Sequence, residues 1–270
     1  MSEWQRVNKA NPCEICQHDS WCLYVDGGTI ICMRVQSPRE KVMRDGSVGW
    51  LHSTDGEIPK RPARMDPKPE VTINASRLMR EFGEHEDFTL VKHLADVLGV
   101  TYHSLRSLGC VWASPHKAFA FPMFDGYGNA TGIRLRSTDG RKWAVKGSHQ
   151  GIFTPNSSPG QRAIICEGPT DSAAAISLGM WAVGRPHCSG GVAEIKNLFR
   201  RCPIREAVIV TDNDGPGRAG SELLIRHLSI PSALLILPCK DMRKFLNLGG
   251  TLDDLNSIVD NLAWHQPVGG

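Results

Sequence analysis

The chain has 270 residues, of which 41% are hydrophobic and 22% are charged, a composition that excludes a fully disordered or fibrous protein. No apolar run approaches the roughly 20 residues of a membrane-spanning helix, and the first residues lack the apolar core of a secretory signal. We therefore expect a cytoplasmic protein without a membrane partner. The net charge of +3 is too small to predict a nucleic-acid partner by itself.

The residue pattern predicts four segments. Residues 1–55 contain four of the nine cysteines and show little helical periodicity. Residues 56–74 contain four prolines and no apolar period, which indicates a semi-extended linker. The remainder has apolar periodicity, first in a part with helices and then strands, and afterwards in a part where strands and helices alternate. We predict these two parts at residues 75–158 and 159–270.

Four cysteines near the N-terminus have the spacing of metal ligands. Cys13 and Cys16 are separated by two residues, which lets both sulfurs reach one ion. Cys22 and Cys32 are equidistant from Gly27 in a predicted hairpin turn, so they can lie opposite each other on two strands. Four thiolates suit tetrahedral Zn²⁺ and leave no open position, so the zinc would be structural and would hold this small domain folded. The predicted zinc ligands are Cys13, Cys16, Cys22 and Cys32, with His18 as the competing fourth ligand.

The third segment changes from helical to strand periodicity. Residues 75–109 are predicted to be helical, with Gly99 ending one helix and Thr101 capping the next. A weak helix-turn-helix pattern covers residues 94–105, where a small packing subdomain is the favoured interpretation. The apolar stripe of the helix before Gly99 consists of Leu90, Val91, His93, Leu94, Val97 and Leu98. Strands are predicted at residues 118–124, 130–136 and 142–146 from their alternation and the tight turns between them.

The last segment has the pattern of a parallel α/β sheet. Its strands are continuously apolar and alternate with helices, which is typical of strands buried on both faces. We therefore expect an α/β protein with a parallel sheet flanked by helices, preceded by a mixed α+β basic subdomain and a small N-terminal β domain. Strands are predicted at residues 163–166, 181–184, 207–211 and 232–237, and helices at 171–178, 194–201, 217–227 and 252–262.

Acidic residues follow the predicted strands of this sheet. Glu167 comes directly after the strand at 163–166, and Asp212 and Asp214 follow the strand at 207–211. Functional groups collect at the carboxyl edge of parallel sheets, where neighbouring carboxylates repel one another unless a divalent cation supplies positive charge. A turn and a helix cap are the competing interpretation, which two motifs after two apolar strands disfavour. We predict Mg²⁺ or Mn²⁺ bound by Glu167, Asp212 and Asp214, with Asp171 and Asp241 serving a further ion or supporting the ligands.

The two acidic motifs resemble those of a known domain. Glu167-Gly168-x-x-Asp171, followed by Asp212-x-Asp214-x-x-Gly217, resembles the Toprim domain of bacterial-type primases, topoisomerases and related nucleases, over residues 161–248. The order of a zinc-binding domain, a linker, a basic strand-rich segment and Toprim is similar to that of bacterial- and phage-type DNA primases. The chain departs from that pattern in two ways. The cysteines do not form two Cys-x2-Cys pairs, and Asp241 stands alone where cellular primases often have two acids.

The resemblance implies a DNA primase, a DNA-directed RNA polymerase that makes short primers on a single-stranded DNA template. It implies nucleotidyl transfer from nucleoside triphosphates, with Mg²⁺ or Mn²⁺ as catalytic and Zn²⁺ as structural cofactors. The chain has no Gly-x4-Gly-Lys-Ser/Thr loop and so no fused helicase motor. A phage- or plasmid-type primase fits best, working in the host cytoplasm with a replicative helicase in trans. The implied catalytic residues are Glu167, Asp212, Asp214, Asp171 and Asp241.

Basic and aromatic residues complete the expected nucleic-acid contacts. Alternation places Arg134 and Arg136 on one face of their strand. A solvated sheet face is the alternative interpretation. The zinc domain is implied to bind the single-stranded template, where Trp21 and Arg34 could stack or pair, although Trp21 serves hairpin packing equally well. The predicted set for the triphosphate or the template-primer backbone is Arg134, Arg136, Arg141, Lys142 and Lys146.

Other Toprim proteins are the rival interpretations. A Toprim nuclease shares the acidic motifs. A non-catalytic zinc and Toprim protein of recombination or replication would bind DNA only, but more than 100 residues separate Cys32 from Glu167, and the acids are intact. A topoisomerase needs a nucleophilic tyrosine, and none of the three tyrosines lies in a recognisable context.

Overall fold

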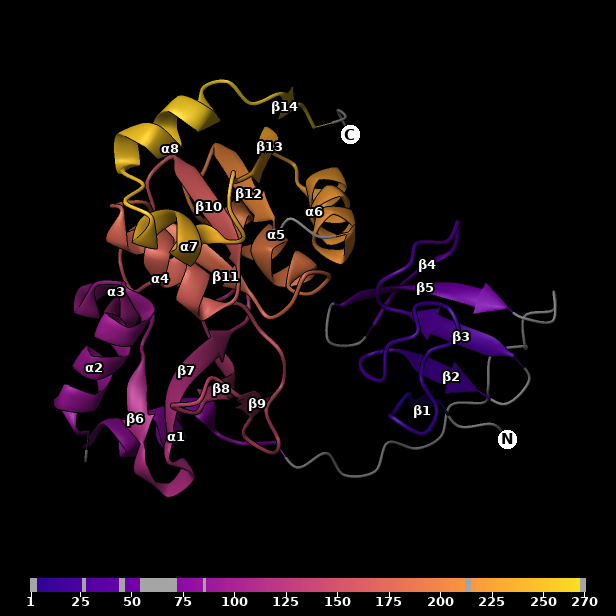
Figure 1. Ribbon diagram of the computed structural model, residues 1–270, viewed down its shortest axis with the longest axis horizontal. Coiled ribbons are helices and arrows are strands. Elements are labelled where there is room, and N and C mark those ends of the chain that lie inside the picture. The colour runs from indigo at the N-terminus through magenta and orange to yellow at the C-terminus, as the bar shows by residue number, and fades with distance from the viewer. Residues whose placement is uncertain are drawn as a thin grey trace. The chain divides into compact units, whose positions relative to one another are not determined.

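The computed structural model describes residues 4–25, 28–43, 47–53, 72–84, 86–211 and 215–267 (Figure 1). The chain divides into two compact units, residues 1–70 and 71–270. The predicted fold class is confirmed in all three parts: an N-terminal β domain, an antiparallel subdomain and a mostly parallel sheet flanked by helices. The predicted boundaries at residues 55, 74 and 158 stay predictions. Within the described ranges, no helix has the length and apolar character needed to cross a membrane.

The N-terminal unit contains a five-stranded antiparallel sheet. Its central hairpin pairs Leu23 with Ile31 and Val25 with Thr29. The apolar core is small, because it consists of a few aliphatic side chains packed around three of the four clustered cysteines. Such a core needs additional stabilisation, which a metal can supply. In spatial order the strands are β1 (Gln5–Arg6), β2 (Leu23–Val25), β3 (Thr29–Cys32), β5 (Val48–Ser53) and β4 (Glu40–Val42).

Three helices open the second unit: α1 (Ala75–Glu84), α2 (Phe88–Leu98) and α3 (Tyr102–Ser107). Gly99 ends α2 in the left-handed conformation (φ 66°), and the Thr101 side chain caps α3, both as predicted. The predicted stripe of α2 was too wide. His93 and Val97 are exposed, and Ala95 takes the buried position between them. Helices α2 and α3 pack into the main core, which fits a packing subdomain.

An antiparallel sheet follows, in the order β6 (Val111–Ala113), β7 (Ala118–Phe124), β8 (Ala130–Arg136) and β9 (Lys142–Ala144). The bounds predicted for β7 and β8 are confirmed, whereas β9 ends two residues earlier than predicted. Strand β6 was missed, because three residues are too few to show an alternation. A short 3-10 helix, Ser114–His116, joins β6 to β7.

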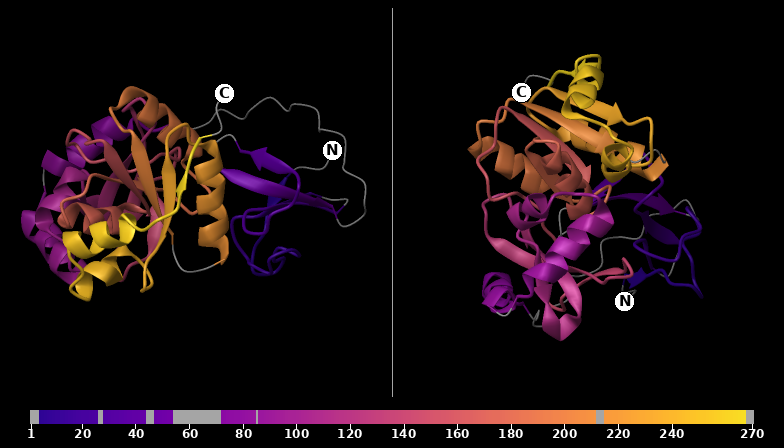
Figure 2. Two further views of the ribbon diagram at one scale, coloured as in Figure 1. Left: turned by 90° about the horizontal axis from the view of Figure 1, so that it is seen from above. Right: turned by 60° about the vertical axis from the view of Figure 1, so that its left-hand side comes forward.

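The second sheet of this unit has the order β11-β10-β12-β13-β14, and β14 alone runs antiparallel among its described strands. Helices α4, α7 and α8 cover one face, and α5 and α6 cover the other (Figures 1 and 2). Burial on both faces explains the continuously apolar strands. The strands are β10 (Arg162–Glu167), β11 (Ala182–Arg185), β12 (Glu206–Thr211), β13 (Ser232–Ile236) and β14 (Trp264–His265). The helices are α4 (Pro169–Ser177), α5 (Val192–Arg201), α6 (Gly215–His227), α7 (Met242–Asn247) and α8 (Leu252–Val259).

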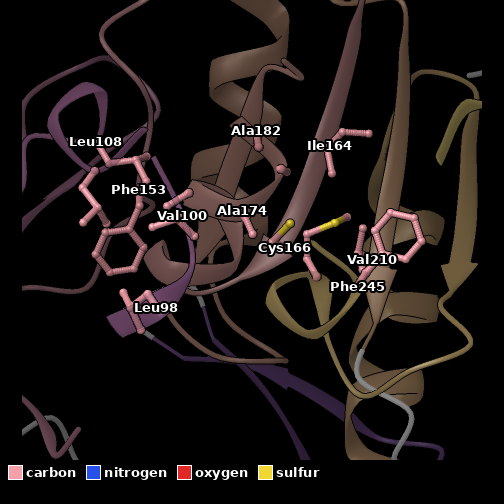
Figure 3. Packing of buried hydrophobic residues seen from close by; sticks show 14 of the residues in the cluster. Leu98, Val100, Leu108, Phe153, Ile164, Cys166, Ala174, Ala182, Val210 and Phe245 are labelled. Carbon is pink, nitrogen blue, oxygen red and sulfur yellow. The ribbon is translucent and has the colours of Figure 1, made fainter. Parts of the chain in front are cut away.

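One apolar cluster joins the helical part to the parallel sheet. Figure 3 shows Leu98 and Leu108 from the helical part and Phe153 from the connecting segment, together with Cys166 of β10 and Phe245 of α7. Phe153 also exchanges two backbone hydrogen bonds with Gly184 of β11, at 2.8 and 2.9 Å. These contacts bring the basic strands β8 and β9 next to the carboxyl edge of the parallel sheet.

Candidate functional site

The four N-terminal cysteines form one cluster. Their Sγ atoms all lie within 4.8 Å of one another. The hairpin register explains half of the cluster, because the pair Leu23–Ile31 places Cys22 beside Cys32, with 3.9 Å between the two sulfurs. A tight turn, closed by a 2.7 Å hydrogen bond from Gln17 N to Cys13 O, turns the other two thiols toward this pair. Within the described part of the chain, this is the one group of at least three potential ligands placed so closely.

The surroundings of the cluster suit thiolate ligands. Backbone N–H groups of Met33 and Val35 donate to the sulfurs of Cys22 and Cys32, at 3.4 and 3.2 Å. The hydrogen bond from the Cys22 thiol lowers the pKa of Cys32 to about 5. Four soft ligands, of which three are buried and Cys16 is half-buried, fit structural Zn²⁺, whose tetrahedral coordination they would complete. The exposed His18 is not part of the group, which favours the all-cysteine ligand set.

The carboxyl edge of the parallel sheet is the second candidate site. Glu167 is the last residue of β10 and Thr211 the last of β12, and the register that pairs Ile165 with Ile209 brings these two ends to the same level. In the sheet, β11 lies on one side of β10 and β12 lies on the other. The chain therefore passes from β10 to β11 in one direction and from β11 to β12 in the opposite direction, so the strand order reverses at β10. Ligands of open α/β sheets bind at such points. Asp212 and Asp214 follow Thr211 in the sequence but lie outside the described residues, so their metal-binding role stays a prediction.

Asp171 and Asp241 are brought together by an arginine that the sequence analysis missed. Asp171 lies in the first turn of α4 and Asp241 caps α7, which contacts α4. The Arg243 Nε lies 3.2 Å from Asp171 Oδ1, and its Nη2 lies 3.5 Å from Asp241 Oδ2. Burial raises the pKa of the Asp171 carboxyl, and Arg243 opposes this shift. The signal available in the sequence was a cation two residues after Asp241.

Three of the predicted basic residues line a narrow pocket of about 70 Å³ together with Glu167. Burial lowers the pKa of Arg134 and of Arg136, and Arg243 lowers that of Arg136 further. Desolvation also lowers the pKa of Lys142, with Arg136 as the next cause. Neighbouring cations thus contribute to the lowered pKa values of Arg136 and Lys142, and a bound anion would relieve this repulsion. The three basic residues of the pocket are Arg134, Arg136 and Lys142.

The other two predicted basic residues lie elsewhere. Arg141 is exposed, and its guanidinium lies 5.0 Å from the centre of the Trp143 ring. Lys146 is exposed and does not line the pocket. Lys142 pairs with Arg136 in the register of β8 and β9, so its side chain lies on the same face as that arginine. This explains why Lys142 lines the pocket and Arg141 and Lys146 do not. The structure therefore brings together three residues of the predicted set of five.

The pocket also contains hydrogen-bonding groups without partners. Thr170 is 1% exposed, and its Oγ1 has no hydrogen-bond partner. The Nε atoms of Arg134 and Arg136 are also buried without partners. Thr170 lies in the first turn of α4, whose N-cap Gly168 offers no side-chain cap. Donors without acceptors at a helix N-terminus are suited to a bound anion. A lone threonine carries no sequence signal, so this residue could not have been predicted.

Arg185 is a buried cation behind the site. It ends β11 in register with Glu167 and is 3% exposed. Its Nε donates to Gly190 O at 2.9 Å, and its Nη1 donates to Gly220 O at 3.3 Å. Burial lowers its pKa to about 10, and Glu167 is among the acids that favour its charged form. Arg185 therefore connects β11 to the loop after it and to α6, next to the candidate site.

Comparisons with known proteins give matches at the level of structure. No protein-family model and no curated protein matches the chain. The zinc-binding and RNA polymerase domains of the Aquifex aeolicus primase match with a TM-score of 0.57 at 14% identity, covering 77% of this chain and 64% of that one. The DnaG catalytic core matches with a TM-score of 0.56 at 13% identity, covering 70% and 80%. The DnaG primase catalytic domain bound to single-stranded DNA matches with 0.54 at 14% identity, covering 71% and 79%. The chain therefore has the fold of the DNA primase catalytic core, preceded by a β domain with four clustered cysteines.

Proposed function

We propose that the chain is a DNA primase that makes short primers on single-stranded DNA by metal-dependent nucleotidyl transfer. The observation that carries this proposal is the pocket in which two half-buried arginines of β8 and a lysine of β9 lie with Glu167 at the reversal point of the sheet. Cations suited to phosphates and an acid suited to a divalent ion meet there, as a reaction between two polyanions requires. The structural match to a primase domain bound to single-stranded DNA supports the template.

In this proposal the acidic residues bind the metal ion and the basic residues bind the phosphates. A primer 3′-hydroxyl attacks the α-phosphorus of a nucleoside triphosphate, the bond to the bridging oxygen breaks, and pyrophosphate leaves. Glu167, with Asp212 and Asp214, would hold Mg²⁺ or Mn²⁺, which would make the hydroxyl a better nucleophile and neutralise charge on the phosphate. Arg134, Arg136 and Lys142 would pair with phosphate oxygens. The Thr170 hydroxyl would donate a hydrogen bond to one of these oxygens.

The zinc domain is assigned a template-binding role in this proposal. Trp21 is 40% exposed and has a positive φ of 74°, an unusual backbone conformation for a bulky residue. An exposed aromatic face suits stacking with a base. Arg34 donates to Ser20 O at 2.7 Å and lies near the cysteine sulfurs, so it supports the cluster rather than the template. A replicative helicase acting in trans and a phage or plasmid origin belong to the same proposal, as does action in the host cytoplasm.

The test is primer synthesis by the zinc-loaded full chain. The protein is incubated with single-stranded template, ribonucleotides and Mg²⁺ or Mn²⁺, and labelled oligomers are resolved on a gel. Glu167→Gln should reduce the yield by at least about 100-fold, because it removes an ionic ligand of the ion. Glu206→Gln is the matched control, since Glu206 lies at the opposite end of β12 and pairs with Arg162. It should stay within about twofold of wild type.

The outcomes separate the rival functions. Oligomers from wild type that are unaffected by Glu167→Gln would contradict the assigned site. Cleavage of labelled DNA without nucleotides would identify a Toprim nuclease. DNA binding without synthesis or cleavage would identify a non-catalytic binding protein.

A further inference from the structure

Arg243 lies between two carboxylates that were predicted to serve a further ion or to support the metal ligands. Asp171 Oδ1 accepts from both the backbone N and the Nε of Arg243, at 3.4 and 3.2 Å. Asp241 Oδ2 lies 3.5 Å from Arg243 Nη2. The other oxygen of Asp241 accepts from Lys244 N at 2.8 Å, as the N-cap of α7. Three of the four carboxylate oxygens are thus already engaged by donors of α7.

This arrangement leaves a divalent ion little to bind. Mg²⁺ requires several oxygens in nearly octahedral geometry at roughly 2.1 Å. To reach Asp171 and Asp241 it would have to displace a guanidinium held by the same two carboxylates. The guanidinium of Arg243 is a cation that is part of the chain, so it supplies positive charge without an ion. Its own backbone N–H to Asp171 ties the position of the side chain to the start of α7.

Further cations lie near the same pair. Arg136 and Lys142 are within electrostatic range of both Asp171 and Arg243, and each of the two arginines disfavours the charged form of Lys142. A divalent ion at Asp171 would face three cations from β8, β9 and α7. Glu167, by contrast, lies at the strand end beside the chain that continues to Asp212 and Asp214.

We propose that Arg243 replaces a divalent cation between Asp171 and Asp241, so that the ions of this site are restricted to the Glu167 end of the sheet edge. The inference rests on the proposed function for the ion held by Glu167, Asp212 and Asp214. Of the two roles predicted for Asp171 and Asp241, it excludes a further ion and leaves support of the metal ligands. The single acid of the third motif then has a physical explanation, because a built-in cation takes over the role of metal charge.

The test counts Mn²⁺ ions. Zinc-loaded full chain is titrated with Mn²⁺, and free ion is measured by its electron paramagnetic resonance signal. Arg243→Gln should bind one Mn²⁺ more than wild type, because it frees both carboxylates. Lys244→Gln is the matched control: it removes one positive charge from the next residue of the same helix, is exposed, and keeps the backbone donor to Asp241. Its stoichiometry should equal that of wild type.

Second variants assign the gained site and cover a folding failure. Asp171→Asn in the Arg243→Gln background should remove the extra ion, whereas Asp171→Asn alone should leave the wild-type number unchanged. Mn²⁺ should also raise the melting temperature of Arg243→Gln more than that of wild type. An unchanged count in folded Arg243→Gln, or an ion lost by Asp171→Asn alone, overturns the inference. If wild type binds no Mn²⁺ and Arg243→Gln binds one, the inference stands and the proposed catalytic ion fails.

Discussion

The thiol cluster and the carboxyl edge of the parallel sheet assemble charged ligands in opposite ways. The cluster brings four soft ligands together and surrounds them with N–H donors, and its core is otherwise small. The edge alternates acids with cations, so that Arg243 lies between Asp171 and Asp241 and three basic residues face Glu167. A site that holds one ion permanently can have every ligand in place. The edge instead pairs part of its acidic charge with cations of its own chain, as Arg243 does between Asp171 and Asp241.

The largest effect is expected from breaking the cluster. Cys32→Ser should release zinc and unfold the N-terminal unit, because zinc binding contributes about 10 kcal/mol or more to the folding of such small domains. Zinc content and limited proteolysis measure the result. His18→Ala is the control and should retain one zinc per chain. If His18→Ala loses zinc while Cys22→Ser keeps it, the ligand set is different from the one favoured by the structure.

The next effect concerns the cations of the edge. Arg134→Met should weaken the apparent affinity for nucleoside triphosphate by about 10- to 100-fold, the equivalent of one or two hydrogen bonds to a charged group. Steady-state kinetics of primer synthesis measures it. Arg141→Met is the matched control, because Arg141 lies outside the pocket and stacks on Trp143. Equal losses in both variants would show that the two arginines act only through general charge.

Two smaller effects of opposite sign are expected at Thr170, a gain in stability and a loss of anion affinity. Thr170→Val removes a buried hydroxyl that has no partner, so the free protein should gain about 1 kcal/mol of stability. The same change should weaken pyrophosphate binding by about 5- to 10-fold, because one hydrogen bond to the anion is lost. Thermal melts and calorimetric titration measure the two effects, and Thr170→Ser should restore the binding. A loss of stability in Thr170→Val would contradict the absence of a partner.

The smallest effect is expected on the pH dependence of stability at Asp254, a carboxylate that lies outside both candidate sites. Asp254 is exposed and forms a capping box with Thr251, whose hydroxyl lowers the pKa of Asp254. A lowered pKa in the folded state stabilises the protein above the unfolded-state value of about 3.9, and this contribution is lost as the pH falls through the folded-state value. Asp254→Asn should therefore melt slightly below wild type at pH 7, and the difference should shrink below about pH 4. A difference that stays constant with pH would exclude the ionised cap as its cause.

The sequence predicted the longer helices and strands better than the short ones. The bounds of β7 and β8 agree with those predicted, because each is a seven-residue stretch that ends at a turn. Gly99 and Thr101 mark the helix ends predicted for them. Short elements escaped, among them β6 and the six-residue α7. Because α7 was not predicted, the position of Arg243 at the sheet edge was not predicted either.

The sequence by itself determined the layers of this protein and the assembly of its cysteines, because both follow from spacing within a few turns or one hairpin. Only the tertiary structure decided which charges meet. Arg243 lies 72 residues from Asp171 in the chain, and the unpartnered hydroxyl of Thr170 shares its pocket with residues of β8 and β9 that are distant from it in sequence. Periodicity is local, whereas the balance of charge at an edge depends on how distant segments cross. The physical reason is that burial, which makes each charge expensive, exists only after the chain has folded.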